Sequence, residues 1–374
     1  MSWRVLPPAG HPMVLHGAAA APEFAGYRAT WVQSGTAALA LALIAARRRS
    51  PQIENPAVIL PGYACPDLVA AALFANVQPI LVDIGCDDPG YDLTALRAAM
   101  SPSVVAVVAV NFLGVSERIA QLREIISACS TALLIEDNAQ WFPEPFPQAA
   151  LQGDLVCLSF GRGKPVSLLG GGVLLAKNGI EMPEIGDIVQ PAMSAGSAFF
   201  AKACAYNALL SPRLYGLVSR LPFLQLGVTK LKPLSEIRAM DLHRQGLLAA
   251  NIHTHLQRSQ HCSDALQALI PNSILDIASR AADRRGRLLR YPVLLADRDK
   301  RDNLLARLQH AGLGATALYQ CVLPEITGVA PHVHIVGALN GAKAFAARLL
   351  TLPVHSGVSA ADVEKLREQL RNAN

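Results

Sequence analysis

Charged and aromatic residues are scarce in this chain. Of its 374 residues, 16% are charged and 5% are aromatic, whereas 52% are hydrophobic. So high an apolar content excludes an intrinsically disordered chain, and the length favours a large α/β domain with a smaller second one. The formal net charge of +5 arises without long basic runs interleaved with aromatic residues, so we expect no nucleic-acid binding.

Long apolar runs and paired cysteines are also missing. The longest apolar runs, such as residues 36–46 and 104–110, are shorter than the roughly 18–20 residues of a membrane-spanning helix. The seven cysteines are scattered singly without a CxxC pair, which is typical of free thiols in a reducing compartment. Residues 1–12 show no charged segment followed by an apolar run, so we expect no secretory signal. These features predict a soluble, cytoplasmic protein.

Two nucleotide-binding motifs are incomplete in this chain. The segment FGRGKP at residues 160–165 is similar to a phosphate-binding P-loop, but Leu158 occupies the position of the first glycine. Pro165 follows the lysine where the P-loop needs Ser or Thr. Val166 likewise breaks a GxGxxG fingerprint. We therefore expect neither a P-loop nor a dinucleotide-binding turn here.

Metal-binding and hydrolase motifs are missing as well. The chain contains no HExxH, and Ser159 lacks the GxSxG context of a serine hydrolase. His253 and His255 fall in a predicted helix, where residues two apart do not share a face. His332 and His334 have no nearby acid or cysteine to complete a ligand set. We expect no metal site.

What the chain does contain is an alternation of apolar strands and helices. Residues 1–30 are expected to be irregular. The expected strands are 57–61, 79–84, 104–112 and 132–137, and the helices between them are 67–76, 91–100 and 116–127. Apolar strands separated by helices indicate a mostly parallel sheet covered on both faces. In such a sheet ligands bind beyond the carboxyl ends of the strands.

The last third also reads as α/β. We expect a long helix at 235–266, a strand at 291–295, a helix at 298–311 and a short strand at 316–319. A final helix is expected after Ser359, whose hydroxyl would form a capping box with Asp362.

One segment, residues 188–235, contains no acidic residue. Its five basic residues lie among apolar ones. Core or subunit-interface helices are the preferred interpretation. A basic amphipathic face for a membrane surface or an acidic partner is the alternative.

Lys164 is the most informative single residue. It lies in a turn between two apolar strands and is the only charge between Arg162 and Lys177. A surface lysine is the usual interpretation of such a residue. In a desolvated site, however, burial lowers the pKa of a lysine amine and lets it attack a carbonyl.

Other residues offer Lys164 partners. Asp137 and Ser159 end the two preceding strands, and a helix begins after the turn Ser34–Thr36. That turn serves either as a simple N-cap, the preferred interpretation, or as an anion site. A lysine, a carboxylate for a protonated pyridine nitrogen and a helix start for a phosphate are what pyridoxal 5'-phosphate (PLP) chemistry needs. A freed lysine can also move a proton as a general base.

In this order the segments resemble the DegT/DnrJ/EryC1/StrS family, the PLP-dependent sugar aminotransferases of fold type I. The matching stretches are SGTAALALAL, ILPGYACPDLVAAALFANVQPILVDI, VVAVNFLG, LLIEDNAQ, CLSFGRGK, LSEI and LTLPVHS. The resemblance implies a large PLP-binding domain at 1–187 with a mostly parallel seven-stranded sheet. It further implies a helical interface segment at 188–235 and a smaller C-terminal α/β domain at 236–374.

The resemblance also implies roles for individual residues. Lys164 matches the Schiff-base lysine and Asp137 the partner of the pyridine nitrogen. The implied cofactor contacts, besides Lys164, are Gly35, Thr36, Tyr63, Asn138, Gln140 and Ser159. The implied enzyme is a homodimer that moves an amino group, from glutamate, to a nucleotide-linked keto-sugar in polysaccharide or secondary-metabolite biosynthesis.

The chain departs from the family pattern at several positions. Cys65 stands where the family has an aromatic residue that stacks on the cofactor, and Tyr63 is the nearest substitute. Gly170 replaces an acid, and Leu231 and Pro233 replace the asparagine and arginine of a partner-subunit motif. Two alternatives therefore stay open: another PLP-dependent sugar-modifying reaction, and a non-catalytic binding or scaffold subunit.

Overall fold

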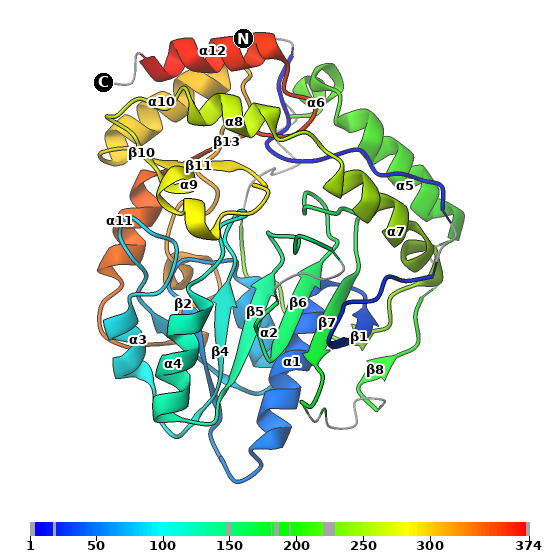
Figure 1. The fold of residues 1–374 in the computed structure, drawn as a ribbon, viewed down its shortest axis with the longest axis vertical. Helices are drawn as coiled ribbons and strands as arrows, with labels where there is room; N and C mark the ends of the chain where they lie inside the picture. Colours follow the sequence, from blue (N-terminus) through cyan, green and yellow to red (C-terminus); the bar gives the residue numbers. More distant parts are fainter. Residues whose placement is uncertain are drawn as a thin grey trace.

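The computed structural model describes residues 4–17, 20–146, 151–180, 182, 187–193, 196–219 and 229–371. A large sheet with strand order β1-β7-β6-β5-β4-β2-β3-β12 forms its centre (Figure 1). Its strands are β1 Tyr27–Val32, β2 Ala57–Pro61, β3 Gln78–Val82, β4 Val104–Val110, β5 Leu133–Asn138, β6 Leu155–Ser159, β7 Gly172–Lys177 and β12 His334–Ile335.

Only β7 runs antiparallel to its neighbours in this sheet, so the predicted mostly parallel sheet is confirmed. Seven strands come from the first half of the chain, as predicted. The additional strand β12 adds two residues to the edge at β3. The prediction that residues 1–30 are irregular was wrong for residues 27–30, which belong to β1, whereas the described residues before Tyr27 form no helix or strand.

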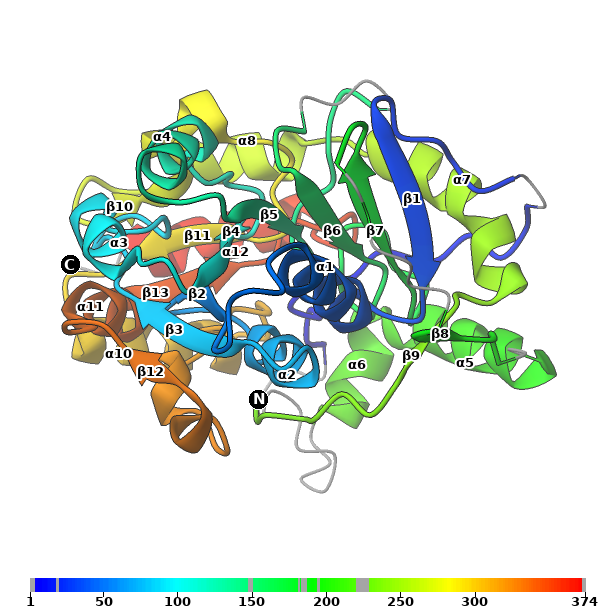
Figure 2. The same cartoon turned by 90° about the horizontal axis from the view of Figure 1, so that it is seen from below.

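Helices cover both faces of the sheet (Figure 2). Helices α1 Gly35–Arg49 and α2 Asp67–Phe74 lie on one face, and α3 Leu93–Ala99 and α4 Ile119–Cys129 lie on the other. On β2, Val58 and Leu60 join the core beneath α1, while Ile59 joins the core beneath α3 and α4. The strand is therefore buried on both sides, which is why its sequence is continuously apolar.

The C-terminal third forms a separate small sheet. Strands β10 Leu275–Asp276, β11 Tyr291–Leu294 and β13 Leu349–Leu352 are antiparallel, in the order β10-β11-β13. The surrounding helices are α8 His261–Gln267, α9 Ile277–Arg280, α10 Arg298–His310, α11 Asn340–Arg348 and α12 Ala360–Arg371. The short strand predicted at 316–319 is a single bridge between Thr316 and Thr351.

The long helix predicted at 235–266 was wrong. The chain instead forms the strand β9 Ile237–Arg238, then α7 Leu242–Leu256, and bends before α8. The guanidinium of Arg287 donates to the carbonyls of Leu256 (3.0 Å) and Arg258. The guanidinium of Arg287 thus binds carbonyls at the end of α7 that have no partner within the helix. Nothing in the local sequence marks this helix end.

The acid-free segment contains β8 Val189–Gln190, α5 Gly196–Leu209 and α6 Pro212–Val218, whereas residues 220–228 lie outside the described residues. The two helices confirm the helical character predicted here, and the domain boundaries stay predictions. Among the described residues, no helix is both long and apolar enough to span a bilayer, and no three metal-ligating side chains cluster.

The first turn of α12 confirms the predicted capping box. Ser359 Oγ accepts from the N–H of Asp362 (3.3 Å), and Asp362 Oδ2 accepts from the N–H of Ser359 (3.0 Å). Arg4 binds the same carboxylate with both terminal nitrogens, Nη2 at 2.6 Å. Burial alone would raise the pKa of Asp362, but the bonds from Arg4 and Ser359 hold that pKa below its usual value.

We expect Asp362→Asn to lower the free energy of unfolding by about 2 kcal/mol at neutral pH, less than a fully buried pair costs because Arg4 is partly exposed. Since the folded-state pKa lies below the unfolded one, this contribution is complete above the unfolded pKa and is lost as pH falls through the folded pKa. Urea unfolding at neutral and acid pH measures it. Glu364→Gln, on the same helix with an exposed partner, is the control and should change stability little; a difference between the two variants that does not vary with pH would contradict the assignment.

Candidate active site

The predicted site residues converge at the carboxyl ends of β5 and β6. Asp137 lies near the end of β5, Ser159 ends β6, and Lys164 follows in the loop that leads to β7. Lys164 is half-buried, and it is close enough to Asp137 for its charge to lower the pKa of that carboxyl group. The structure therefore places the lysine and the carboxylate in one neighbourhood, as ligand sites of parallel sheets require.

Backbone hydrogen bonds hold the lysine loop in place. At its base the N–H of Phe160 donates to Gly171 (2.8 Å), and its carbonyl accepts from Leu168 (2.7 Å). At its tip the N–H of Lys164 donates to the carbonyl of Gly161 (3.2 Å), and Gly163 supplies a positive φ of 74°. The loop is thus a closed turn, which limits where the lysine amine can point.

Asp137 is a buried carboxylate without a cation of its own. It is 8% exposed, and Oδ1 accepts from the N–H of Ala139 (2.9 Å). Among the described residues, no Lys, Arg or His side chain forms an ion pair with Asp137. Burial raises the pKa of Asp137, against the opposing effects of the Ala139 N–H and the Lys164 charge. A cationic ligand group at this carboxylate would supply the missing partner.

Its neighbour Glu136 points to the other side of the strand, as expected for consecutive strand residues. Glu136 Oε1 accepts from the N–H of Gln152 (2.6 Å) and of Gly153. This carboxylate therefore fixes the turn before β6, and only Asp137 is left for the site.

Ser34 caps helix α1, which confirms the simpler of its two interpretations. Its Oγ accepts from the N–H of Ala37 at 3.1 Å. The same helix start also lies against Ser159: a Cβ on Gly35 would come within 2.6 Å of the Ser159 Cβ and 2.9 Å of its Oγ. Glycine at 35 thus lets a serine hydroxyl lie at the helix N-terminus, where anions are favoured. Capping and anion binding are compatible here.

Gly35→Ala tests this close approach. The added methyl group must displace Ser159, so we expect at least roughly tenfold weaker binding of PLP or of inorganic phosphate, the loss of about 1.4 kcal/mol. Equilibrium dialysis or fluorescence titration measures the affinity. Gly161→Ala adds the same methyl group where it meets only ordinary contacts of 3.5 Å or more and serves as the control. Equal losses in both variants would show that the effect comes from general loop disturbance.

Asn138 and Gln140 continue the site beyond β5. Asn138 Oδ1 accepts from Asn111, and its Nδ2 is buried with no partner among the described residues. Gln140 Oε1 accepts from the N–H of Leu113 (3.2 Å), and Nε2 donates to the hydroxyl of Tyr319 (3.3 Å). The predicted residues Asn138 and Gln140 therefore lie beside the site, and Gln140 is held by a tyrosine from the C-terminal third.

Tyr319 was missed by the sequence analysis. It adjoins Cys65 as well as Gln140, and burial raises its pKa well above the usual value, so its hydroxyl stays protonated. No motif surrounds position 319 in the sequence, so only the folded structure reveals this neighbour.

The placement of Tyr63 requires a correction. It is 2% exposed, its hydroxyl donates to the carbonyl of Tyr319 (2.8 Å), and its ring packs against Phe112, Tyr319 and Phe345. Because core side chains enclose the ring, it is not placed to stack on a cofactor. Cys65 lies instead within the electrostatic reach of Lys164, with its thiol pKa raised to about 11, chiefly by burial.

Two further residues of the sequence analysis, Thr36 and Leu231, have hydrogen-bond partners of their own. Thr36, predicted as a phosphate contact, donates its hydroxyl to Asp67 Oδ2 at 3.3 Å. Leu231 donates its N–H to the carbonyl of Thr327 (3.0 Å) and packs over Gly328. Lys230 and Lys232, on either side of it, are exposed.

Comparison with known proteins places this geometry in a family. A model described as the DegT/DnrJ/EryC1/StrS aminotransferase family matches residues 19–371. Protein MosB of Rhizobium meliloti is 32% identical over 149 residues, which span 39% of this chain but only 28% of that protein. The chain thus matches less than a third of the length of this curated relative.

Solved structures show the same fold. The putative sugar aminotransferase Spr1654 from Streptococcus pneumoniae, in its PLP form, has a TM-score of 0.67 at 17% identity and covers 92% of this chain and 86% of its own. DesV from S. venezuelae, in complex with a ketimine intermediate, has a TM-score of 0.65 at 21% identity, with coverages of 92% and 84%. The fold is therefore that of the PLP-dependent aminotransferases. Because the family model spans nearly the whole sequence, the chain belongs to the DegT/DnrJ/EryC1/StrS family of PLP-dependent aminotransferases.

Proposed function

We propose that the chain binds PLP and transfers an amino group, with glutamate as donor, to the keto group of a nucleotide-linked sugar. The observation that carries the proposal is Asp137: a buried carboxylate near Lys164 at the carboxyl end of the sheet, which forms no ion pair among the described residues. A protonated pyridine nitrogen is the kind of cation that this site lacks.

The residues present fit the cofactor. Asp137 would pair with the pyridine nitrogen, while Ser159 and the N-terminus of α1 would hold the phosphate. Lys164 would hold the aldehyde covalently, and its amine, once released, would move a proton at the substrate carbon. When bound, PLP supplies the electron sink that stabilises negative charge beside the transferred nitrogen. The thiol of Cys65 and the hydroxyl of Tyr319 would form the wall beside Lys164.

A half-reaction tests the proposal directly. The purified protein is loaded with PLP and mixed with glutamate, and the visible spectrum is followed together with the 2-oxoglutarate formed. We expect conversion to the pyridoxamine form, with one 2-oxoglutarate per cofactor. A panel of keto-sugar nucleotides then reverses the reaction and identifies the acceptor. Stable PLP binding without any conversion would favour the non-catalytic scaffold, and no binding at all would contradict both.

We further propose that the chain acts as a homodimer. Helix α5 carries a single charged residue, Lys202, yet leaves Phe200 37% and Leu209 36% exposed, and Leu217 on α6 is 57% exposed. A helix that is apolar all round is normally covered. Sedimentation of the wild type and of a Leu217→Asp variant tests this: a wild-type monomer at micromolar concentration would contradict it.

The seven cysteines are all free, which supports the proposed cytoplasmic location.

A further inference from the structure

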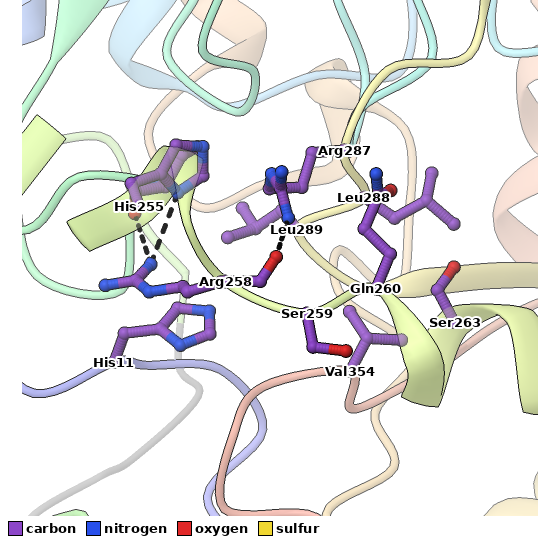
Figure 3. Close-up of a pocket in the computed structure, with 11 residues that line it drawn as sticks. His11, His255, Arg258, Ser259, Gln260, Ser263, Arg287, Leu288, Leu289 and Val354 are labelled. Carbon is purple, nitrogen blue, oxygen red and sulfur yellow. Dashed lines mark hydrogen bonds between the residues drawn. The ribbon is translucent and has the colours of Figure 1, made fainter. Parts of the chain in front are cut away.

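A small cavity of about 30 Å³ lies directly behind the lysine loop (Figure 3). Pro165, the residue after Lys164, forms one wall, and His11 from the N-terminal segment forms another. The other polar lining residues are His255 near the end of α7, Arg287 before β11, and Arg258, Ser259, Gln260 and Ser263, which follow α7. Figure 3 shows the guanidinium of Arg258 between the imidazoles of His255 and His11.

The two arginines of this cavity differ in their partners. Arg287 is neutralised: its Nε donates to Glu144 Oε1 at 2.9 Å. Arg258 donates through Nη1 to the carbonyl of Pro165 (3.0 Å) and to His255 Nδ1 (3.2 Å), both of them uncharged acceptors. Within the described residues, no carboxylate forms an ion pair with Arg258. Burial and the charge of Arg287 lower the pKa of Arg258 to about 10, so the cation persists at neutral pH, half-buried and without an ion-pair partner in the described parts of the chain.

Each imidazole has one buried ring nitrogen without a hydrogen-bond partner among the described residues. Because Nδ1 of His255 accepts from Arg258, the proton of this neutral ring lies on Nε2, and Nε2 has no hydrogen-bond partner among the described residues. His255 is 4% exposed, and its Nε2 lies 3.9 Å from Glu144, beyond hydrogen-bond distance. His11 Nδ1 is likewise buried and unpartnered there.

Neither imidazole of the cavity adds a positive charge near neutral pH. Burial, followed by the positive charge of Arg258, lowers the pKa of His11 to about 2 and that of His255 to about 3. Both rings are therefore neutral near neutral pH. Nearby His355 differs, because its Nε2 bonds the carbonyl of Pro7 (2.8 Å) and its Nδ1 accepts from Gly357 (3.1 Å). The cavity thus contains one cation, Arg258, that forms no ion pair among the described residues, and two neutral imidazoles beside it.

We propose that this cavity binds a small monovalent anion, either a carboxylate group or a halide ion, beside the guanidinium of Arg258. The cavity exceeds the 10–15 Å³ that one water needs and has room for one such group, but not for a nucleotide or a sugar. Two sources share this chemistry: the carboxylate end of an amino-acid substrate, and a free inorganic anion. The first source rests on the proposed transamination, whereas the second does not.

The site is coupled to the lysine loop through a single bond. Arg258 Nη1 donates to the carbonyl of Pro165, the residue after Lys164. An anion that draws the guanidinium toward itself weakens this bond, so we expect anion binding to shift the Lys164 loop.

Thermal unfolding of the full chain against added salt tests the site without any catalysis. Sodium chloride and sodium formate are compared with sodium methanesulfonate, a larger anion without a carboxylate group, at equal ionic strength. We expect a saturable rise in Tm with chloride and formate only, and Arg258→Gln should remove it. Arg285→Gln is the matched control, since Arg285 lies in the neighbouring segment and its side chain donates to Gln267 (3.1 Å) at an exposed position.

Identical responses to all three salts, or a selective response that survives Arg258→Gln, would overturn the proposal. If Arg258→Gln does not fold, His11→Phe takes its place, because the larger ring fills the cavity while the arginine is kept, and it should abolish the selective rise. The glutamate half-reaction then separates the two sources. A KM for glutamate raised tenfold or more in Arg258→Gln, with kcat little changed, identifies the substrate carboxylate. An unchanged KM together with a lost chloride response identifies a free anion.

Discussion

Lys164→Ala is expected to abolish both covalent PLP attachment and transamination. The alanine variant has no amine to join the cofactor aldehyde or to move the proton at the substrate carbon. Loss of the proton transfer alone costs a factor on the order of 10²–10⁴ in rate, and loss of covalent attachment adds to it. The residue is half-buried in a closed turn, so its removal leaves the backbone hydrogen bonds of Phe160 and Gly171 in place.

Borohydride reduction followed by peptide mass analysis measures the attachment. We expect a single adduct on the peptide that contains Lys164 in the wild type and none in the variant. Lys177→Ala, at the exposed end of β7, is the control and should keep both adduct and activity. An adduct that persists in the Lys164 variant, or one that lies on another lysine, would mean that the site has been placed on the wrong loop.

The sequence predicted the part of this fold that depends on local pattern. The strands β2 to β6 were recognised because each contains an apolar run, as expected for a strand buried on both faces, and β2 to β4 also lie between helical segments. Asp137 and Ser159 could be placed because polar residues at the ends of such strands meet at one edge of the sheet. The capping roles of Ser34 and Ser359 likewise depend on residues only a few positions away.

What the sequence analysis missed depends on distant contacts. Every side chain of β1 except Val32 is at least partly exposed, so this strand lacks the apolar run by which the other strands were found. The break between α7 and α8 is held by Arg287, about thirty residues further on. Tyr319 reaches Gln140 across 179 residues of sequence. Tyr63 was misassigned because its aromatic partners come from remote segments and enclose it in the core.

Asp137→Asn is expected to separate activity from stability. The amide keeps the oxygen that accepts from Ala139 but cannot pair as an anion with a protonated pyridine nitrogen. Removing one such preorganised electrostatic partner costs a factor on the order of 10²–10³ in kcat. PLP should still attach to Lys164, so the adduct remains while the glutamate half-reaction slows. Single-turnover kinetics of the half-reaction measure the loss, and an unchanged rate would contradict the role given to Asp137.

The same substitution should leave the cofactor-free protein equally stable or more stable. Burial raises the pKa of Asp137 in the folded state, so the folded chain binds the proton more tightly than the unfolded one does. Stability then falls as pH rises from the unfolded toward the folded pKa, and the ionised carboxylate is a cost above that range. Replacing it with a neutral amide removes the cost, as is common for buried charges. A Tm of the cofactor-free variant clearly below that of the wild type at neutral pH would show that the carboxylate has a stabilising partner. A Tm at or above that of the wild type would mean that the ionised Asp137 destabilises the cofactor-free fold, at a position where a cationic ligand group could pair with it.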